Sequence, residues 1–396
     1  MAHIFRGATS KTGSVLIGLT AAALALTACG GSAQSEGGTA ATTDSGSSPA
    51  SAASSDTSAL AAVCASPSLE LFGDMTPADD AAPVDTTSLK SDKDSFKVAY
   101  VDFGPVNSWR VQAAGSTQQL ADELGVELIM TDAQGDGTKQ IADAEDALAQ
   151  GVDAMLISPV SPEGVAPVIE QASSAGIPVI VWASDADTDK YTAKVLADDT
   201  FFGYAGGTKL AEDIGGAGKQ VIMLRGIAGN SVEQARYDGA ATALKEAGVE
   251  IVAEEYGDWA YDKGKSITEN LLATYPDIDG IWASGAAMTL GAMDAFKDAG
   301  KPLVPMSGEN LNSFMLTAAE ANLATSAPQF PTWQGPEALK LAIRSLCGLE
   351  ISNSYLLKPP AITDMKAASK PNLSGDYWVE NYLTDEQIAA IFPDGQ

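Results

Sequence analysis

The chain has 396 residues and a formal net charge of −29, with 52 Asp and Glu against 23 Lys and Arg. A chain this acidic is a poor candidate for binding nucleic acid, or an anionic membrane, through its own charge. The only histidine is His3, so the rest of the chain cannot form a Ser-His-Asp triad, a Cys-His pair or a His-ligated metal site.

The first part of the chain has the pattern of an export signal. Arg6 and Lys11 precede an apolar run at 15–26, which is long enough for a signal-peptide core and too short to span a bilayer. The sequence LTAC that ends at Cys29 resembles the lipobox of bacterial lipoproteins, in which the cysteine receives lipid and becomes the N-terminus. The alternative is an ordinary secretory signal with a chance cysteine. Both interpretations predict a protein that works outside the cytoplasm, and the first predicts a lipid anchor at the cell membrane.

These signals divide the N-terminal region into three parts: a signal peptide at 1–28, a tether at 29–62 and an arm at 63–96. The tether is almost entirely Gly, Ser, Ala, Thr, Asp and Gln, a composition that stays disordered. Besides Cys29 the chain has only Cys64 and Cys347, and two thiols in an oxidising compartment suggest one disulfide. The alternative is two free thiols, and two thiols are too few for a structural zinc site.

From residue 97 onward, short apolar runs alternate with helical stretches. Strands 25 to 30 residues apart with helices between them indicate parallel α/β sheets, and the apolar character of the runs suits sheets covered on both faces. No GxGxxG follows the first strand, which argues against a dinucleotide, and we expect no cofactor. The expected strands are 97–101, 126–130, 154–157, 177–182, 220–225, 249–253, 280–283 and 302–306.

The number of strands predicts two α/β lobes rather than one. We expect the first lobe to contain 97–199 and about 330–355. The second contains 200–329 and about 356–396, which includes a C-terminal tail. Ligands of open parallel sheets bind beyond the carboxyl ends of the strands, so two facing lobes would form a cleft there.

Polar and aromatic side chains follow the strands at this expected cleft. Planar polar groups can form paired hydrogen bonds with sugar hydroxyls, and flat aromatic rings suit the C–H faces of a sugar. The candidate ligand residues are Asn107, Trp109, Arg110, Trp182, Asp185, Asn230, Arg236, Trp259, Glu309, Asn310 and Gln329.

Several motifs carry a resemblance to a known family. The segment 226–231 (GIAGNS) with Arg236, the run 270–277 (NLLATYPD) and the run 288–292 (MTLGA) are the matching parts. Over about 250 residues the chain resembles the periplasmic sugar-binding proteins of ABC importers, in the ribose/galactose-binding (type I) group. The resemblance implies two Rossmann-like lobes with parallel sheets joined by a hinge, the type I periplasmic-binding-protein fold.

The resemblance assigns roles to some of the candidates. Asn107, Trp109 and Arg110 match the group's first-loop ligand residues, and Arg236 matches its sugar-binding arginine. Trp259 matches a ring that stacks on the sugar, and Gln329 a hinge-region glutamine.

Three positions depart from the group's pattern. The Asp-Arg pair after the fourth strand is replaced by 182–185 (WASD), an Asn-Asp pair by Gly285 and Ala286, and an aspartate by Glu309. The departures point to a ligand other than ribose, such as another sugar or a polyol.

Some candidates also have a purely structural interpretation. Trp282 lies inside an apolar strand and is expected in the core, and Trp378 is expected to pack on a lobe. Trp182 fits the core or the cleft, and Arg110 fits a ligand contact or an ion pair with acidic surface. Removing the Arg236 side chain is expected to weaken binding with little loss of stability.

The function predicted from these observations is capture without catalysis. A small sugar or polyol would enter the cleft, the lobes would close, and the closed form would dock on the membrane subunits of an ABC permease. The alternative within the fold is a ligand sensor for a signalling receptor. The alternative of another class is an anchored glycoside hydrolase that uses Asp185 and Glu309 as its two carboxylates.

Overall fold

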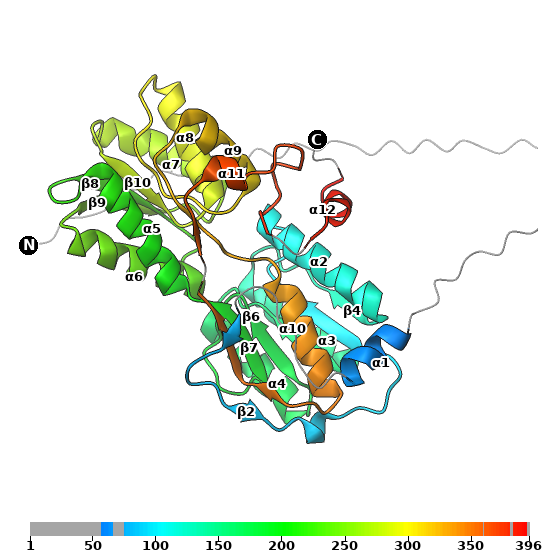
Figure 1. Ribbon diagram of the computed structural model, residues 1–396. Coiled ribbons are helices and arrows are strands. Elements are labelled where there is room, and N and C mark those ends of the chain that lie inside the picture. Colours follow the sequence, from blue (N-terminus) through cyan, green and yellow to red (C-terminus); the bar gives the residue numbers. More distant parts are fainter. Residues whose placement is uncertain (1–56, 66–74, 359, 381–382, 394–396) are drawn as a thin grey trace, which may run out of the picture. The chain divides into compact units, whose positions relative to one another are not determined.

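The computed structural model describes residues 57–65, 75–358, 360–380 and 383–393. The expected signal peptide, Cys29 and most of the expected tether lie outside these residues. The described part contains two α/β lobes, each with a parallel sheet between helical layers (Figure 1). The expectation of a two-lobed parallel α/β fold is therefore confirmed.

The sheet of the first lobe has seven strands in the order β1-β13-β7-β6-β5-β3-β4, and only β1 runs antiparallel to its neighbour. The strands are β1 (Thr76–Pro77), β3 (Lys97–Val101), β4 (Glu127–Met130), β5 (Ala154–Ile157), β6 (Val179–Trp182), β7 (Ala193–Ala197) and β13 (Ser354–Leu357).

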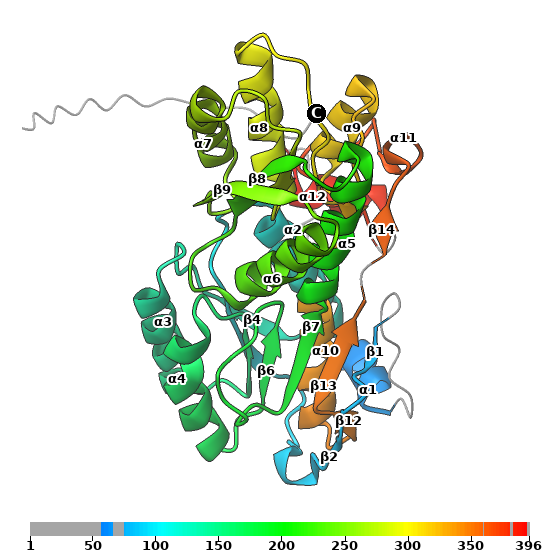
Figure 2. The ribbon, with the colours of Figure 1, turned by 90° about the vertical axis from the view of Figure 1, so that its left-hand side faces the viewer.

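Helices cover both faces of this sheet. Alternate residues of the central strands point to opposite faces, so Tyr100 and Leu156 pack toward α2 (Ser108–Leu124) and α10 (Gln334–Leu346). Ala99 and Met155 pack on the other face, toward α3 (Gly137–Ala149) and α4 (Pro162–Ser174) (Figure 2). The apolar runs of the sequence follow from burial on both faces.

The second lobe is built on a three-stranded parallel sheet in the order β10-β8-β9. Helices α5 and α6 pack on each other, as do α7 and α8, and α9 contacts α8. The elements are α5 (Asp199–Ile214), β8 (Gln220–Arg225), α6 (Ser231–Glu246), β9 (Glu250–Tyr256), α7 (Tyr261–Thr274), β10 (Gly280–Ala283), α8 (Ala286–Asp298) and α9 (Asn312–Ala321).

One strand prediction needs correction, and some strands of the structure were not predicted. The expected strand at 302–306 is reduced to a single bridge between Ile281 and Met306, because Pro302 and Pro305 have no N–H to donate to a ladder. The strands β7 and β13 were not expected, although they form the side of the first sheet next to the lobe crossings.

Three short segments of the described chain connect the two sheets. The chain crosses between β7 and α5, between β11 (Ala327–Pro328) and α10, and between β13 and β14 (Ala361–Ile362). The crossings lie together: Asp198 N donates to Leu357 O at 2.7 Å, and β11 pairs with β14.

The N-terminal arm packs on the first lobe. A helix, α1 (Thr57–Ala65), contacts α2 and α10, with Leu60 buried against them, and Cys64 is disulfide-bonded to Cys347. The expected tether extended to residue 62, but this helix already begins at Thr57 because its apolar residues reach the core. Farther along the arm are β2 (Pro83–Val84), which pairs with β12 (Ile351–Ser352), and a 3-10 turn at Thr87–Leu89.

The C-terminal tail contacts both lobes. Its first helix, α11 (Met365–Ala368), packs on α9, whereas α12 (Asp385–Ile391) packs on α2. The grouping of 356–396 with the second lobe therefore does not describe α12. Within the residues described here, no helix is both long and apolar enough to cross a bilayer.

Candidate functional site

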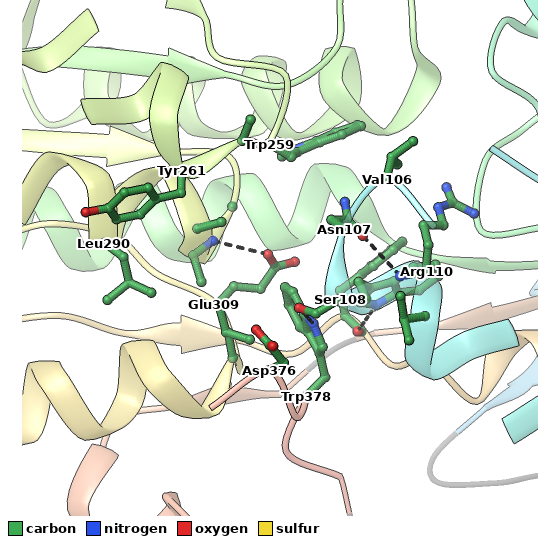
Figure 3. A pocket seen from close by; sticks show the side chains of 18 of the residues that line it. Val106, Asn107, Ser108, Arg110, Trp259, Tyr261, Leu290, Glu309, Asp376 and Trp378 are labelled. Atoms are coloured by element: carbon green, nitrogen blue, oxygen red, sulfur yellow. Dashed lines mark hydrogen bonds between the residues drawn. The ribbon is translucent and has the colours of Figure 1, made fainter. Parts of the chain in front are cut away.

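A pocket of about 650 Å³ is lined by both lobes and by the tail. The first lobe contributes the loop after β3 and the start of α2, and the second lobe contributes loops after β8, β9 and β10 (Figure 3). This is the carboxyl-end side of both sheets, where the sequence placed the cleft. The predicted residues that line the pocket are Asn107, Trp109, Arg110, Arg236, Trp259 and Glu309.

Asn107 and Arg110 are held together at the start of α2. Asn107 is the N-cap residue, and its Oδ1 accepts a hydrogen bond from Arg110 N at 3.0 Å. The Arg110 guanidinium donates to Asp102 at 2.6 Å and to Ser158 Oγ at 2.8 Å. It also lies 4.1 Å from the ring centroid of Phe103. Arg110 is therefore ion-paired, with a buried carboxylate rather than with acidic surface.

Arg236, on α6, is bonded to two buried carboxylates. Its Nε donates to Asp199 at 2.9 Å, and its Nη1 donates to Glu309 at 2.9 Å and to Ser284 O at 2.7 Å. The guanidinium carbon lies 3.8 Å from the ring centroid of Phe202 and 4.4 Å from that of Phe330. Hydrogen bonds at Nε and Nη1 and the two rings therefore hold the Arg236 side chain in place.

Burial changes the protonation of the carboxylates around these arginines. It raises the pKa of Asp199 to about 7, although the Arg236 charge opposes the rise. Burial likewise raises the pKa of Glu309 and of Asp102, against the opposing charges of Arg236 and Arg110. In each case desolvation outweighs the neighbouring guanidinium.

Two tryptophans give the pocket flat apolar surfaces. Trp259 lies in a loop with a positive φ of 55°, and its Nε1 donates to Ser284 Oγ at 3.1 Å. A Cβ at Gly226 would lie 2.4 Å from this ring, so the glycine is needed for its position. Trp109 is nearly buried, donates from Nε1 to Phe330 O at 2.7 Å, and stacks on Trp182 with ring centroids 6.0 Å apart. The ring of Trp109 therefore forms a rigid part of the pocket wall.

The remaining five predicted residues lie outside the pocket lining, each with a structural role. Trp182 supports Trp109 from below and is fully buried. Asp185 pairs with Lys194 at 3.0 Å, and its N–H donates to Ser231 Oγ. Asn230 is the N-cap residue of α6, Asn310 is buried among backbone groups, and Gln329 N donates to Pro360 O at a crossing.

Other residues of the lining were not predicted. They include Ser108, Tyr261 and Asp262, as well as Asp376 and Trp378 in the tail. Trp378 packs as expected and is only 5% exposed, yet one edge reaches the pocket. No sequence signal identified the tail, because it lies far from any predicted strand. Trp282 is in the core, as predicted, at 1% exposed.

The acidic side chains of the described part can be compared with what a metal site or the expected hydrolase would need. No group of three or more His, Cys, Asp or Glu side chains in the described part could hold a metal ion. Asp185, one of the two carboxylates of the hydrolase alternative, does not line the pocket. The two arginines of the lining, Arg110 and Arg236, are both paired with buried carboxylates, and aromatic rings lie beside them.

Comparison with known proteins finds a family model, sequence relatives and solved structures that are similar to this chain. The pattern of the periplasmic binding protein domain matches residues 100–350. The chain is 28% identical over 248 residues to the ribose import binding protein RbsB of Bacillus subtilis, covering 63% of this chain and 81% of the relative. It is 26% identical over 304 residues to a xylitol-binding protein of Mycolicibacterium smegmatis, covering 76% and 84%. A solved structure from Mycobacterium smegmatis in complex with β-D-fucofuranose has a TM-score of 0.67 at 27% identity, covering 76% and 99%.

Proposed function

Because the chain belongs to the periplasmic binding protein family, whose members similar to it are sugar-binding proteins and not enzymes, we propose that it captures a small sugar or polyol for an ABC permease. The pocket between the two lobes is the proposed binding site. The observation that carries the proposal is the pairing of both pocket arginines with buried carboxylates, beside the Trp109 and Trp259 rings.

This pairing suits an uncharged ligand. A free guanidinium in a pocket would favour an anion such as a phosphate, but Arg110 and Arg236 are already compensated by Asp102, Asp199 and Glu309. Their remaining N–H groups and the carboxylate oxygens offer donors and acceptors to hydroxyls, and the rings offer surface to C–H faces. A polyhydroxylated neutral molecule uses both kinds of contact.

Delivery would follow from a hinge movement. The three crossings of the described chain lie side by side, so small rotations there would separate or join the lobes. Ligand bound to both lobes would favour the closed form, because only that form makes every contact. The closed form is the one proposed to dock on the permease.

A thermal-shift screen tests the proposed function. D-Ribose, xylitol, L-arabinose, D-galactose, D-allose and myo-inositol would each be added to the purified protein. A ligand at 100 times its dissociation constant stabilises the folded state by about 2.7 kcal/mol, which gives a clear rise in Tm. Chromatography of the same mixtures should show every sugar unchanged. No stabilisation by any neutral sugar or polyol, or turnover of one, would contradict the proposal.

The membrane attachment is part of the same proposal. We expect Cys29 to be lipidated, because the sequence LTAC that ends at this cysteine follows a basic start and a short apolar run. Expressed in a bacterium, the wild-type protein should sediment with membranes, and Cys29→Ala should be released. Cys29→Ala behaving like the wild type in this fractionation would rule the anchor out.

A further inference from the structure

A segment of the C-terminal tail, 374–380, fastens the two lobes to each other. We call it the strap. It lies beyond the matched domain, which ends at residue 350, and it connects α11, packed on the second lobe, to the part of the tail that packs on α2 (Figure 1).

Adjacent residues of the strap are bonded to opposite lobes. Trp378 N donates to Oε1 of Gln112 at 2.8 Å, and Gln112 Nε2 donates to Trp378 O at 3.0 Å. Val379 N donates to Asn310 O at 2.8 Å, and Asn310 Nδ2 donates to Val379 O at 3.1 Å. Gln112 belongs to α2 of the first lobe, whereas Asn310 precedes α9 of the second. Both side chains are fully buried, so breaking these bonds without admitting water would leave buried polar groups unsatisfied.

The strap is also bonded to a crossing. The Glu380 carboxylate accepts hydrogen bonds from Thr332 N and, at 3.0 Å, from Thr332 Oγ1. Gln112 Nε2 also donates to Thr332 Oγ1, at 3.1 Å. Thr332 lies between β11 and α10, where the chain passes from one lobe to the other. The strap therefore joins both lobes and the hinge into one hydrogen-bonded unit.

Two strap side chains face the pocket. Trp378 donates from Nε1 to Ser108 Oγ at 3.0 Å, which fixes its ring at the start of α2. The exposed Asp376 carboxylate also belongs to the pocket lining (Figure 3) and has no hydrogen bond or ion pair with any residue the structure describes. A carboxylate left without a partner at a pocket wall is a ready acceptor for a ligand hydroxyl.

We propose that the strap fastens the lobes along one edge of the pocket and presents Asp376 and Trp378 to the ligand. The lobes then separate by pivoting about this edge, and the pocket opens on the side away from it. The contact of Asp376 and Trp378 with the ligand rests on the proposed function, whereas the fastening of the two lobes does not.

The fastening is tested without ligand. Gln112→Met keeps the length of the side chain and removes its hydrogen bonds to Trp378 and to Thr332. Gln118→Met is the matched control, because Gln118 lies on the same helix and, among the described residues, its side chain is hydrogen-bonded to Asp122 alone. Donor and acceptor dyes would be placed at exposed positions 145 and 270 through non-canonical residues, which leaves the native cysteines untouched. Single-molecule energy transfer on the full protein then reports the distance between the lobes.

We expect Gln112→Met to broaden the distance distribution toward longer values, and Gln118→Met to match the wild type. Circular dichroism and a cooperative unfolding transition verify that each variant is folded. If folded Gln112→Met has the wild-type distribution, the proposal is overturned.

The ligand contact is tested with whichever of the six screened compounds binds. Asp376→Asn preserves shape and removes the charge, and should weaken that compound by about three- to tenfold, since hydrogen bonds to charged groups are the stronger ones. Asp146→Asn, at an exposed site on α3, is the matched control and should bind as the wild type does. An Asp376→Asn affinity equal to that of the wild type overturns the proposal and leaves the proposed function intact. If no compound binds the wild type, the proposed function fails, and the distance measurement alone decides the fastening.

Discussion

At the scale of single residues, Arg236 is the charged centre of the pocket. It is 2% exposed and lies between Asp199 and Glu309, two carboxylates that are themselves buried. The sequence analysis assigned it to the ligand site and treated it as a side chain outside the core. In the structure it lines the pocket and also neutralises buried charge, so we expect its loss to affect folding.

Arg236→Ala should therefore lower the free energy of unfolding by about 3–5 kcal/mol, because breaking a buried pair leaves uncompensated carboxylates. Urea denaturation of the variant and the wild type measures the difference. The triple variant Arg236→Ala, Asp199→Asn, Glu309→Gln is the control, and it should recover much of the loss because its carboxylates are gone. An Arg236→Ala midpoint equal to that of the wild type would show that the pair contributes nothing to stability.

Most of the pocket residues selected from sequence come soon after a strand, whereas Arg236 lies on α6 and was selected by its motif. The carboxyl ends of parallel strands meet at one edge of a sheet, so residues such as Asn107 and Trp259 could be placed together without a structure. The same reasoning also selected Asp185 and Asn230, which lie at that edge and serve local structure instead. It could not select Asp376, because no periodic pattern determines the path of the tail.

At the scale of secondary-structure elements, the contact between α5 and α6 positions Arg236. The two helices approach closely at glycines: a Cβ at Gly203 would lie 1.9 Å from Arg236 O, and one at Gly239 would lie 2.0 Å from Thr200 O. Neither gap can be widened by rotating a side chain, since the obstructing atoms belong to backbone. The position of the arginine thus depends on two residues that have no side chain.

Gly203→Ala should destabilise the protein by about 1–3 kcal/mol, because the added methyl group forces the helices apart. It should also weaken sugar binding, since α6 would move together with Arg236. Gly164→Ala is the control: it also lies in a helix, α4, where the nearest atom is 3.6 Å from the added Cβ. Alanine is the better helix former, so this control should be neutral or slightly stabilising. Equal melting temperatures for the two variants would contradict the close-packing argument.

The elements differ in how well sequence could predict them. The strands at 97–101, 154–157 and 280–283 were predicted at their observed positions, because all their residues except Lys97 are buried on one face or the other. In β7, partly exposed residues alternate with buried ones and one is a lysine, so the apolar signal is weak. Strand β13 lies between the short strands β12 and β14, with no helix directly on either side. The regular strand–helix–strand spacing therefore did not reveal it.

At the scale of the whole molecule, buried acids lie where the lobes meet. Glu380 links the strap to a crossing, and burial raises its pKa to about 8 although Thr332 donates to it. Asp199 begins the helix that follows another crossing, and its pKa is raised to about 7. The ordinary pKa values of these side chains are 4.5 for a glutamate and 3.8 for an aspartate. Between these ordinary values and the raised ones, the folded chain retains protons that the unfolded chain has lost.

The free energy of unfolding should therefore fall as pH rises from about 5 to 9, because stability decreases wherever the folded state binds more protons. The contribution of Glu380 is complete below its unfolded pKa and is lost as pH passes through about 8. Glu380→Gln is neutral at every pH and should show a shallower decline. Urea titrations at five pH values between 5 and 9 measure both curves.

Increasing net negative charge also destabilises the wild type at high pH, but it acts nearly equally on a variant that differs by one charge. The difference between the two curves therefore isolates Glu380. Glu145→Gln is the control, because this glutamate is exposed on α3, and its curve should run parallel to that of the wild type. A Glu380→Gln curve that also runs parallel would mean that Glu380 has the same proton affinity in the folded and unfolded chains. In that case the Glu380 carboxyl would not be desolvated in the folded chain, and pH would not change its hydrogen bonds to Thr332.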